Sequence, residues 1–273
     1  MNILFAGCGD IAQRTRTHIG EGDHCFGLRR NIQALPANIE GIHADLAQPA
    51  QLQYLATQHF DYVVVTLTPA GRPYREAYVE ASQNLLAALQ PKPPKHVFYI
   101  SSTSVYHQRD HEWVNETTPA LAEGNGAILR EAEQVWLGSN LPSTVLRLSG
   151  IYGHDRRFLL KQLLAGVGAA QGHHYTNRIH SDDAASAIAH LIALHSNGGN
   201  LVDTYIVSDD EPADQATMVQ WAQQHLPIQQ VEPQPVLGRR AGSKRCSNAL
   251  LKSTGFSFTY PSFREGYAAI TAA

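Results

Sequence analysis

The chain has 273 residues, of which 43% are hydrophobic and 16% are charged, with a formal net charge of −3 at pH 7 and a pI near 6.5. A chain of this length buries a core without disulfide or metal support, and its slightly acidic balance argues against nucleic-acid binding, which needs a basic face. The three cysteines, Cys8, Cys25 and Cys246, are too few and too widely spaced for a disulfide framework or a zinc knuckle, and they indicate reduced thiols.

Apolar runs and helical patterns alternate through the first hundred residues. Three consecutive valines after Tyr62 predict a central strand that is buried on both faces of a parallel sheet. Apolar residues over 74–89 repeat with a helical period, and the prolines that begin at Pro91 end this helix. The same patterns predict strands at residues 3–6, 24–28, 39–43 and 96–100, and helices from residue 11 and at 51–58.

The alternation continues to about residue 153 and then weakens. We predict helices around residues 128–135 and 184–195 and strands at 143–148 and 205–207. Strands and helices in this rhythm form right-handed βαβ units. The sequence therefore predicts an α/β fold, a doubly wound parallel sheet of the Rossmann type, with a small C-terminal lobe.

A glycine-rich loop follows the first strand and opens the first helix. In the dinucleotide fingerprint G-x-G-x-x-A, the first glycine allows a tight turn, the second admits the pyrophosphate, and the small third residue lets helix and strand pack closely. The helix amides then receive the phosphate charge. The six residues of this predicted site are Gly7, Cys8, Gly9, Asp10, Ile11 and Ala12. Asp10 departs from this chemistry, since a carboxylate repels a pyrophosphate, and we interpret it as a helix cap.

The end of the second strand distinguishes NAD from NADP. An acidic residue there binds the 2′-hydroxyl of the adenosine ribose, whereas arginine accommodates a 2′-phosphate. This strand ends in Arg29 and Arg30 with no acid in place, which favours NADP(H) over NAD(H). The alternative is that the two arginines form an ordinary solvated strand end.

Four later segments, in this order, resemble the extended short-chain dehydrogenases/reductases, the superfamily of NAD-dependent sugar epimerases and dehydratases. Residues 101–106 read Ser-Ser-Thr-Ser-Val-Tyr and are similar to the family's segment after the fifth strand. Residues 146–153 are similar to its Leu-Arg…Tyr-Gly segment, residues 177–184 to its Ile-His-Val-Asp-Asp helix start, and residues 246–266 to its C-terminal signature. The resemblance covers nearly the whole chain and is strongest to a bacterial epimerase/dehydratase-like subgroup.

The resemblance implies a cofactor-binding sheet and a smaller lobe that covers the substrate. It assigns residues 1–153 and 177–207 to the dinucleotide-binding domain and residues 154–176 and 208–273 to the lobe. The expected partner is a small-molecule substrate, nucleotide-linked or another small polar compound. A homodimer that pairs through the helix of residues 74–89 is also expected.

The resemblance also implies further cofactor contacts. It places Asp45 and Leu46 at the adenine and the end of the fourth strand against the cofactor. The contacts that it adds to the glycine loop and the two arginines are Asp45, Leu46, Leu67, Thr68, Pro69, Ser149 and Gly150.

The chain departs from the family at the catalytic tyrosine and lysine. In the family a tyrosine transfers a proton, a lysine four residues later lowers the pKa of that tyrosine, and a serine positions the carbonyl. A phenol with a free pKa near ~10 needs such a neighbouring cation to act at neutral pH. Ser102 fills the serine position, but Asn125 aligns with the tyrosine and Leu129 with the lysine.

Other residues carry acid–base chemistry close to these positions. Tyr106 follows the family's serine position by four residues, and we predict that it takes over proton transfer. Tyr152 and His180 are further candidates, for which packing and a helix-capping hydrogen bond are the expected roles. Arg130 is expected to pair with Glu133 or the glutamine after it, and not to replace the lysine.

Two functions fit this pattern. The first is an NADP(H)-dependent reductase, epimerase or dehydratase with displaced catalytic residues, which the retained substrate lobe favours. The second is a non-catalytic NADP(H)-sensing module, which the missing tyrosine and lysine favour. We expect the enzyme, although fold alone does not determine function.

The remaining expectations concern metals and location. The histidines are scattered, and the adjacent pair His173 and His174 is expected to lie in a solvated turn, so no metal site is predicted. No apolar run approaches the ~20 residues of a membrane span, and the chain opens without a basic segment or cleavage site. We therefore expect a cytoplasmic protein without membrane contact.

Overall fold

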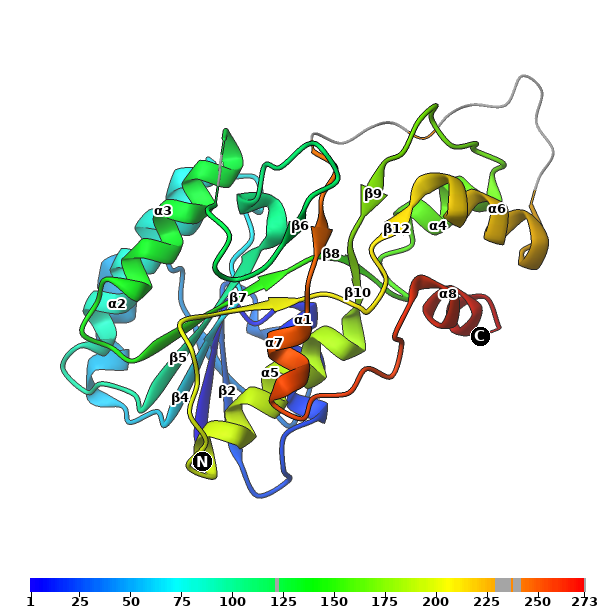
Figure 1. Cartoon of the computed structure of the whole chain (residues 1–273). Helices are drawn as coiled ribbons and strands as arrows, with labels where there is room; N and C mark the ends of the chain where they lie inside the picture. Colours follow the sequence, from blue (N-terminus) through cyan, green and yellow to red (C-terminus); the bar gives the residue numbers. More distant parts are fainter. Residues whose placement is uncertain (121–122, 229–236, 238–241, 273) are drawn as a thin grey trace. The chain divides into compact units, whose positions relative to one another are not determined.

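A seven-stranded sheet organises the computed structural model, which describes residues 1–120, 123–228, 237 and 242–272 (Figure 1). The strand order is β11-β7-β5-β4-β1-β2-β3, and β1 pairs in parallel with both β2 and β4. The order reverses between β1 and β4, so the predicted doubly wound Rossmann-type sheet is confirmed. The strands are β1 (Asn2–Ala6), β2 (His24–Arg29), β3 (Glu40–His43), β4 (Tyr62–Val65), β5 (His96–Ser102), β7 (Ser143–Leu148) and β11 (Thr204–Val207).

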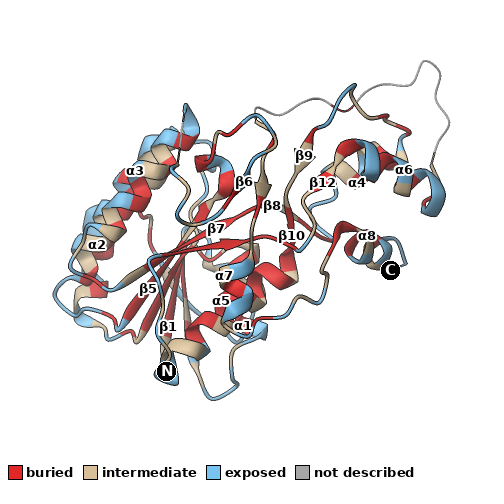
Figure 2. Ribbon diagram, in the orientation of Figure 1, coloured by how far each residue is buried: buried red, intermediate tan, exposed pale blue. Residues whose placement is uncertain are grey.

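Helices cover both faces of this sheet. Figure 1 shows α2 and α3 on one face and α1 and α5 on the other. These helices are α1 (Asp10–Thr17), α2 (Ala81–Leu89), α3 (Asn125–Leu137) and α5 (Ser181–Ser196). Because both faces are covered, all four residues of β4 are buried, as the red strands of Figure 2 illustrate.

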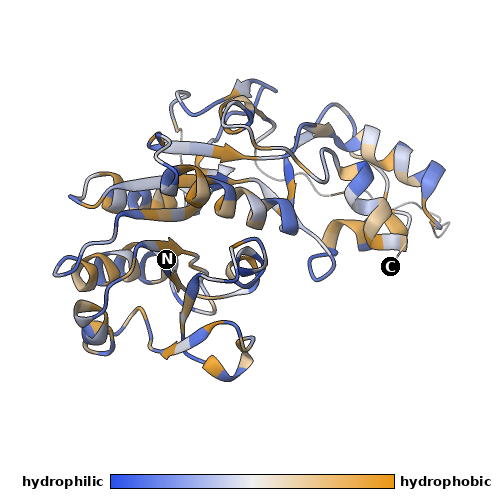
Figure 3. Ribbon diagram, turned by 90° about the horizontal axis from the view of Figure 1, so that it is seen from below, coloured by the Kyte–Doolittle hydropathy of each residue, from blue (hydrophilic) through white to orange (hydrophobic). Residues whose placement is uncertain are grey.

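The core under α2 and α3 is apolar and closely packed. Trp136 of α3 is fully buried and its ring stacks on that of Tyr99 in β5, with the centroids 6.2 Å apart. Val63 and Val65 of β4 and Leu85 of α2 belong to the same buried cluster. Hydrophobic and hydrophilic colours alternate along the helices in Figure 3, as expected for helices with one apolar face.

Two connecting helices depart from α-helical geometry. The predicted helix at 51–58 is a 3-10 helix, η2 (Pro49–Thr57). The helix predicted over 74–89 begins as a π-helix, η3 (Glu76–Glu80), and continues as α2. Single π-turns often occur at functional sites. Two shorter 3-10 helices, η1 (Ile32–Ala34) and η4 (Thr103–Val105), follow β2 and β5.

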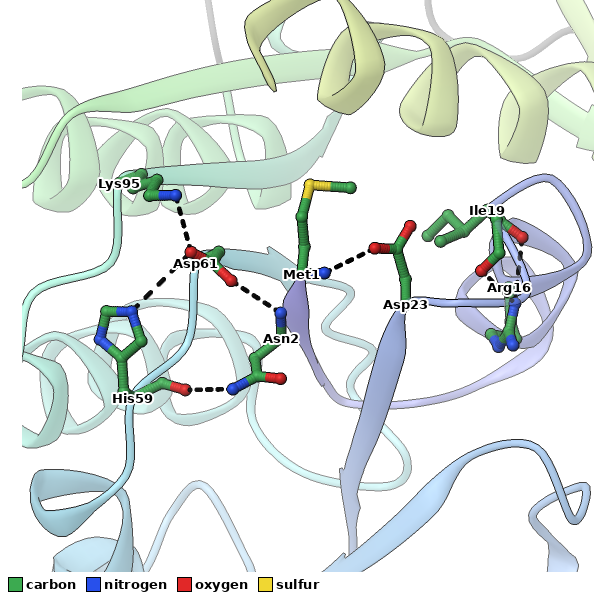
Figure 4. Close-up of polar contacts among 9 residues, drawn as sticks. Met1, Asn2, Arg16, Ile19, Asp23, His59, Asp61 and Lys95 are labelled. Atoms are coloured by element: carbon green, nitrogen blue, oxygen red, sulfur yellow. Dashed lines mark hydrogen bonds and ion pairs between the residues drawn. The ribbon is translucent and has the colours of Figure 1, made fainter. Parts of the chain in front are cut away.

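The amino ends of β1, β4 and β5 are joined by one carboxylate (Figure 4). Asp61 accepts a hydrogen bond from the backbone N–H of Asn2 at 2.8 Å and pairs with the Lys95 ammonium at 2.8 Å. The Lys95 hydrogen bond holds the pKa of Asp61 below its ordinary value. The ionised carboxylate therefore stabilises the strand ends that lie away from the glycine loop.

A buried histidine begins β5 at the same edge. His96 is 6% exposed, and its Nε2 lies 2.9 Å from the Thr144 hydroxyl. Its ring is 4.8 Å from the ring of His195, which in turn lies 3.1 Å from the Tyr62 hydroxyl through Nδ1. Burial, with the neighbouring His195, lowers the pKa of His96 to about 4, so its ring is neutral at pH 7.

The chain divides into two compact units. The first comprises Met1–Val105, Ala122–Arg147 and Ala185–Tyr205, and the second comprises Tyr106–Leu121, Leu148–Ala184 and Ile206–Ala273. Compactness does not reveal which ligand each unit binds. The expected division into a cofactor domain and a substrate lobe therefore stays a prediction.

The second unit has short strand pairs and its own core. Tyr152 and Phe263 belong to this core with Met218 of α6. Its strand pairs are β8 with β10, β9 with β12 and β6 with β13. The elements are α4 (Phe158–Leu164), α6 (Gln215–His225), α7 (Ala249–Ser253), α8 (Phe263–Ala272), β6 (Trp113–Val114), β8 (Gly150–Tyr152), β9 (Tyr175–Thr176), β10 (Arg178–His180), β12 (Ala213–Asp214) and β13 (Arg245–Cys246).

Candidate functional site

A cavity of about 550 Å³ opens at the carboxyl ends of β1, β2, β3 and β4, within the first unit. In doubly wound sheets, ligands bind at this edge where the strand order reverses. The lining residues are Gly7, Cys8, Gly9, Leu28, Arg29, Arg30, Asn31, Ala44, Asp45, Leu46, Ala47, Thr66, Leu67, Thr68, Pro69, Ala70, Arg72, Ala77 and Ala81. Ten of the predicted cofactor residues are among them.

The glycine loop forms the floor of this cavity. Gly7 has a φ of +82°, and a Cβ on it would lie 2.4 Å from the backbone oxygen of Thr66 at the end of β4. The Thr66 hydroxyl donates to the Gly7 carbonyl at 2.6 Å. Gly9 caps α1 in an extended conformation, and the nearest atom to an added Cβ, the Gly7 oxygen, is 3.8 Å away. The loop is thus closed beneath Gly7 and open above Gly9.

The three predicted residues after Gly9 lie in α1. Ile11 and Ala12 are buried and let the helix pack against the sheet. Asp10 is the first residue of the helix and not its cap, because the N-cap is Gly9 and makes no side-chain capping bond. The interpretation of Asp10 as a cap is therefore wrong. Its carboxylate accepts a hydrogen bond from Arg14 Nε one turn later, at 2.7 Å.

The two arginines at the end of β2 differ in their surroundings. Arg29 donates from Nη1 to the Cys8 carbonyl at 3.0 Å, so its guanidinium supports the glycine loop. Arg30 is exposed at the cavity and makes no hydrogen bond or ion pair with the residues that the structure describes. Cys8 is 1% exposed, and burial raises the pKa of its thiol to about 12. Arg30 is therefore a cation that is available to an anionic ligand here.

Asp45 and Leu46 follow β3 and also line the cavity. The Asp45 carboxylate binds the Arg72 guanidinium through both oxygens, with Nη1 donating to Oδ1 at 2.7 Å and Nη2 donating to Oδ2. Asp45 Oδ1 also accepts from the backbone N–H of Ala47 at 3.1 Å. The Arg72 hydrogen bond holds the pKa of Asp45 below its ordinary value, with a smaller contribution from the charge of Arg30.

The loop after β4 turns tightly above the cavity. Leu67, Thr68 and Pro69 lead into a turn in which Ala70 has a φ of +47° and Gly71 a φ of +87°. The backbone N–H of Arg72 donates to the Pro69 carbonyl at 2.9 Å and closes the turn.

Ser102 and Tyr106 belong to different units. Ser102 ends β5, is half-buried, and its Oγ accepts the backbone N–H of Ser104 at 3.1 Å. Tyr106 is 1% exposed, and its hydroxyl donates to the Asn115 carbonyl at 2.8 Å. The proton of Tyr106 is therefore engaged within its own unit, and its catalytic role stays a prediction.

The helix that carries the catalytic tyrosine and lysine in the family, α3 in this chain, contains neither residue at those positions. Asn125 is the first residue of α3 and is exposed, while Leu129 is 6% exposed. Arg130 Nη1 donates to Glu133 at 2.7 Å, which confirms the expected pairing. Glu133 is fully buried and also binds Arg147, with Nη2 donating to Oε2 at 2.7 Å. The Glu133 carboxylate of α3 is thus engaged by two arginines within the protein.

The later candidate residues lie in the second unit. Ser149 is 4% exposed, and Gly150 begins β8. Tyr152 is buried, which raises the pKa of its hydroxyl, and it donates to the Ser262 carbonyl at 3.3 Å. His180 is 1% exposed and its Nδ1 accepts the backbone N–H of Asp182 at 3.3 Å, a bond of the expected capping type.

Several cavity residues were absent from the sequence prediction. They are Leu28, Asn31, Ala44, Ala47, Thr66, Ala70, Arg72, Ala77 and Ala81. Position after a parallel strand is a usable signal for Asn31, Ala44 and Thr66, because strand ends meet at one edge. Ala77 lies in the π-helix and Ala81 begins α2, so their approach to the cavity depends on a backbone feature that apolar periodicity does not reveal.

The described part of the chain has neither a cluster of metal-ligating side chains nor a membrane-spanning helix. In those residues no group of three or more histidine, cysteine, aspartate and glutamate side chains is arranged to hold a metal ion. Among the same residues no helix has the length and apolar character needed to cross a membrane.

Comparison with known proteins identifies the family. A protein from Methylobacillus flagellatus, named as an NAD-dependent epimerase/dehydratase, shares 35% sequence identity, with a TM-score of 0.85 over 99% of this chain and 97% of that protein. The chain belongs to the NAD-dependent epimerase/dehydratase family. This family falls within the extended short-chain dehydrogenases/reductases, so the resemblance seen in the sequence is confirmed.

Two other proteins match either over part of the chain or with lower sequence identity. Protein YeeZ of Escherichia coli K12 is 39% identical over 148 residues, and the match spans 50% of each protein. The UDP-glucuronic acid 4-epimerase of Bacillus cereus, solved with UDP-glucuronic acid and NAD, has a TM-score of 0.80 over 100% of this chain and 99% of that one. Its identity is 18%, so this likeness shows the fold alone. No family model matches the chain.

Proposed function

We propose that this chain binds NADP(H) in the cavity and acts on a small polar or nucleotide-linked substrate as an epimerase, dehydratase or reductase. The observation that carries the proposal is Arg30, an exposed guanidinium that lines the cavity and makes no ion pair with the described residues. Arginine at the end of the second strand accommodates a 2′-phosphate. We take the substrate class from the B. cereus epimerase, which shares the fold and was solved with UDP-glucuronic acid and NAD.

The geometry of the glycine loop also supports the binding of a dinucleotide in the cavity. The nearest atom to an added Cβ at Gly9 is 3.8 Å away, so a pyrophosphate has room to approach the backbone there. The amides at the start of α1 and the positive end of its dipole would receive the phosphate charge. When bound, such a cofactor supplies reversible hydride transfer to a carbonyl.

Ser102 is the residue that we propose to orient the substrate carbonyl. Because its Oγ accepts the Ser104 N–H, its own proton remains available to donate to a carbonyl oxygen. Tyr106 serves as proton donor in this proposal if its hydroxyl leaves the Asn115 carbonyl when substrate binds. The variants Ser102→Ala and Tyr106→Phe test the two roles separately, since turnover equal to wild type in either removes that residue from the site.

Calorimetric titration with NADPH and NADH tests the cofactor. We expect wild type to prefer NADPH and Arg30→Ala to lose about 10- to 100-fold in NADPH affinity with little change for NADH, because charge-assisted hydrogen bonds contribute that much. Arg29 is a poor target because it supports Cys8. The matched control is Arg75→Ala, whose side chain pairs with Glu131 and is 54% exposed. Equal affinities of wild type for the two nucleotides would overturn the NADP(H) assignment.

The alternative function is a cofactor sensor without chemistry. It is favoured by Leu129, which is buried at the position of the family's lysine. Incubation with 4-deuterated NADPH and keto-sugar nucleotides separates the two functions. Stereospecific loss of deuterium supports the enzyme, and tight binding without any loss supports the sensor. The expected homodimer is tested by light scattering during gel filtration.

A further inference from the structure

We infer that Arg72 is a positioning residue for cofactor selectivity, which masks the Asp45 carboxylate so that the cavity accepts a ribose 2′-phosphate. Masking here means that Arg72 neutralises the carboxylate and engages both of its oxygens. The inference rests on the proposed NADP(H) function and adds a second determinant to Arg30. It assigns a role to a residue outside the glycine loop and outside the strand ends.

The contact itself is a bidentate ion pair inside the cavity. Arg72 meets both carboxylate oxygens of Asp45, in the planar fork that matches arginine to a carboxylate. The two side chains are only 27% and 17% exposed, so solvent screens the pair less than a surface pair. Arg72 Nε also lies 3.4 Å from Glu76, one turn along the chain. The guanidinium is therefore held from two sides.

The backbone directs Arg72 to this position. The turn from Pro69 to Arg72 has two successive residues with positive φ and a closing hydrogen bond, which is the type I′ pattern. Ala70 is one of the two residues, although side chains other than glycine rarely adopt such a φ. Strained backbone of this kind gathers at functional sites. The turn fixes the backbone position from which the Arg72 side chain reaches Asp45.

The charges at the cavity explain why masking is needed. Asp45 and Arg30 line the same cavity, and their charges interact. A bare carboxylate would repel a 2′-phosphate and would compete with it for Arg30. With Asp45 bound to Arg72, Arg30 keeps no ion pair within the described residues. The Asp45 carboxylate is thus made compatible with a 2′-phosphate in the same cavity.

A double-mutant cycle on the full chain tests this inference. Affinities for NADPH, NADH, adenosine 2′,5′-bisphosphate and 5′-AMP are measured for wild type, Arg72→Ala, Asp45→Ala and the double variant. We expect Arg72→Ala to lower the preference for the 2′-phosphorylated ligands about 10- to 100-fold. The double variant should recover most of that preference, because it has no carboxylate left to mask. Arg75→Ala, which removes an ion pair outside the cavity, should match wild type.

The outcomes separate this inference from the proposed function. Equal affinity of wild type for NADPH and NADH would overturn the function. A wild-type preference that survives in Arg72→Ala would overturn the inference alone. Failure of the double variant to recover the preference would also overturn it, since Arg72 would then bind the phosphate directly. Thermal unfolding checks that each variant folds, and the milder pair Arg72→Gln and Asp45→Asn replaces any that does not.

Discussion

Alanine at Gly9 should separate cofactor binding from folding. The φ of Gly9 is −96°, which alanine adopts without strain, and its Cβ would lie 3.8 Å from the nearest atom. Replacing such a glycine reduces the entropy of the unfolded chain, so we expect Gly9→Ala to unfold at the wild-type temperature or about 1–3 °C higher. The methyl group would occupy the space that we assign to the pyrophosphate. NADPH affinity should therefore fall at least about tenfold.

Gly7→Ala is the contrasting variant. Its Cβ would lie 2.4 Å from the Thr66 backbone oxygen, and its φ of +82° is left-handed. The conformational penalty is about 1–2 kcal/mol, and displacing the β4 backbone adds about 1–3 kcal/mol. Thermal unfolding and calorimetric titration of both variants provide the comparison. Wild-type affinity in Gly9→Ala, or a lower unfolding temperature than in Gly7→Ala, would refute this account of the loop.

Two further predictions concern stability. Glu133→Ala should lower the free energy of unfolding by about 3–5 kcal/mol, because it leaves the buried charge of Arg147, which is 3% exposed, without its carboxylate. Urea unfolding measures this loss. A loss no larger than that of Arg130→Ala, which removes the partly exposed partner of Glu133, would contradict the prediction. Burial lowers the pKa of His96 to about 4, below the ordinary 6.5, so the unfolded chain binds the extra proton and stability falls as pH drops from about 6.5 through 4. When the pH falls from 7.5 to 4.5, the free energy of unfolding of His96→Gln should fall by about 2–3 kcal/mol less than that of wild type. Parallel plots of unfolding free energy against pH for the two proteins would refute this.

The sheet was predictable because its signals are local and apolar. Tyr62 and three valines form β4 as predicted, and β7 also has its predicted bounds. A parallel strand buried on both faces must be apolar throughout, so its sequence is unambiguous. The glycine loop was equally clear, because a fingerprint that directly follows a strand and opens a helix has few other uses.

The part of the cavity wall that is formed by the loops after β3 and β4 was not predictable, because it depends on contacts between segments that are distant in the sequence. The contact of Asp45 with the adenine stays a prediction. Its pairing with Arg72 joins the loops after β3 and β4. No pattern in either loop specifies that pair. The role of Asp10 was missed for a related reason, since both a cap and a first-turn residue are acidic in sequence. Only the backbone at Gly9 distinguishes them.

The burial of Cys8 has a practical consequence for chemical modification. Alkylating agents and oxidants attack the thiolate, and a thiol with a pKa of about 12 is ionised in roughly one molecule in 10⁵ at pH 7. Cys25 and Cys246 are buried as well. A glycine loop that contains cysteine is therefore resistant to thiol reagents while the protein is folded. Labelling of Cys8 itself by such reagents would report unfolding of this loop, and nucleotide titrations can be performed without added reductant.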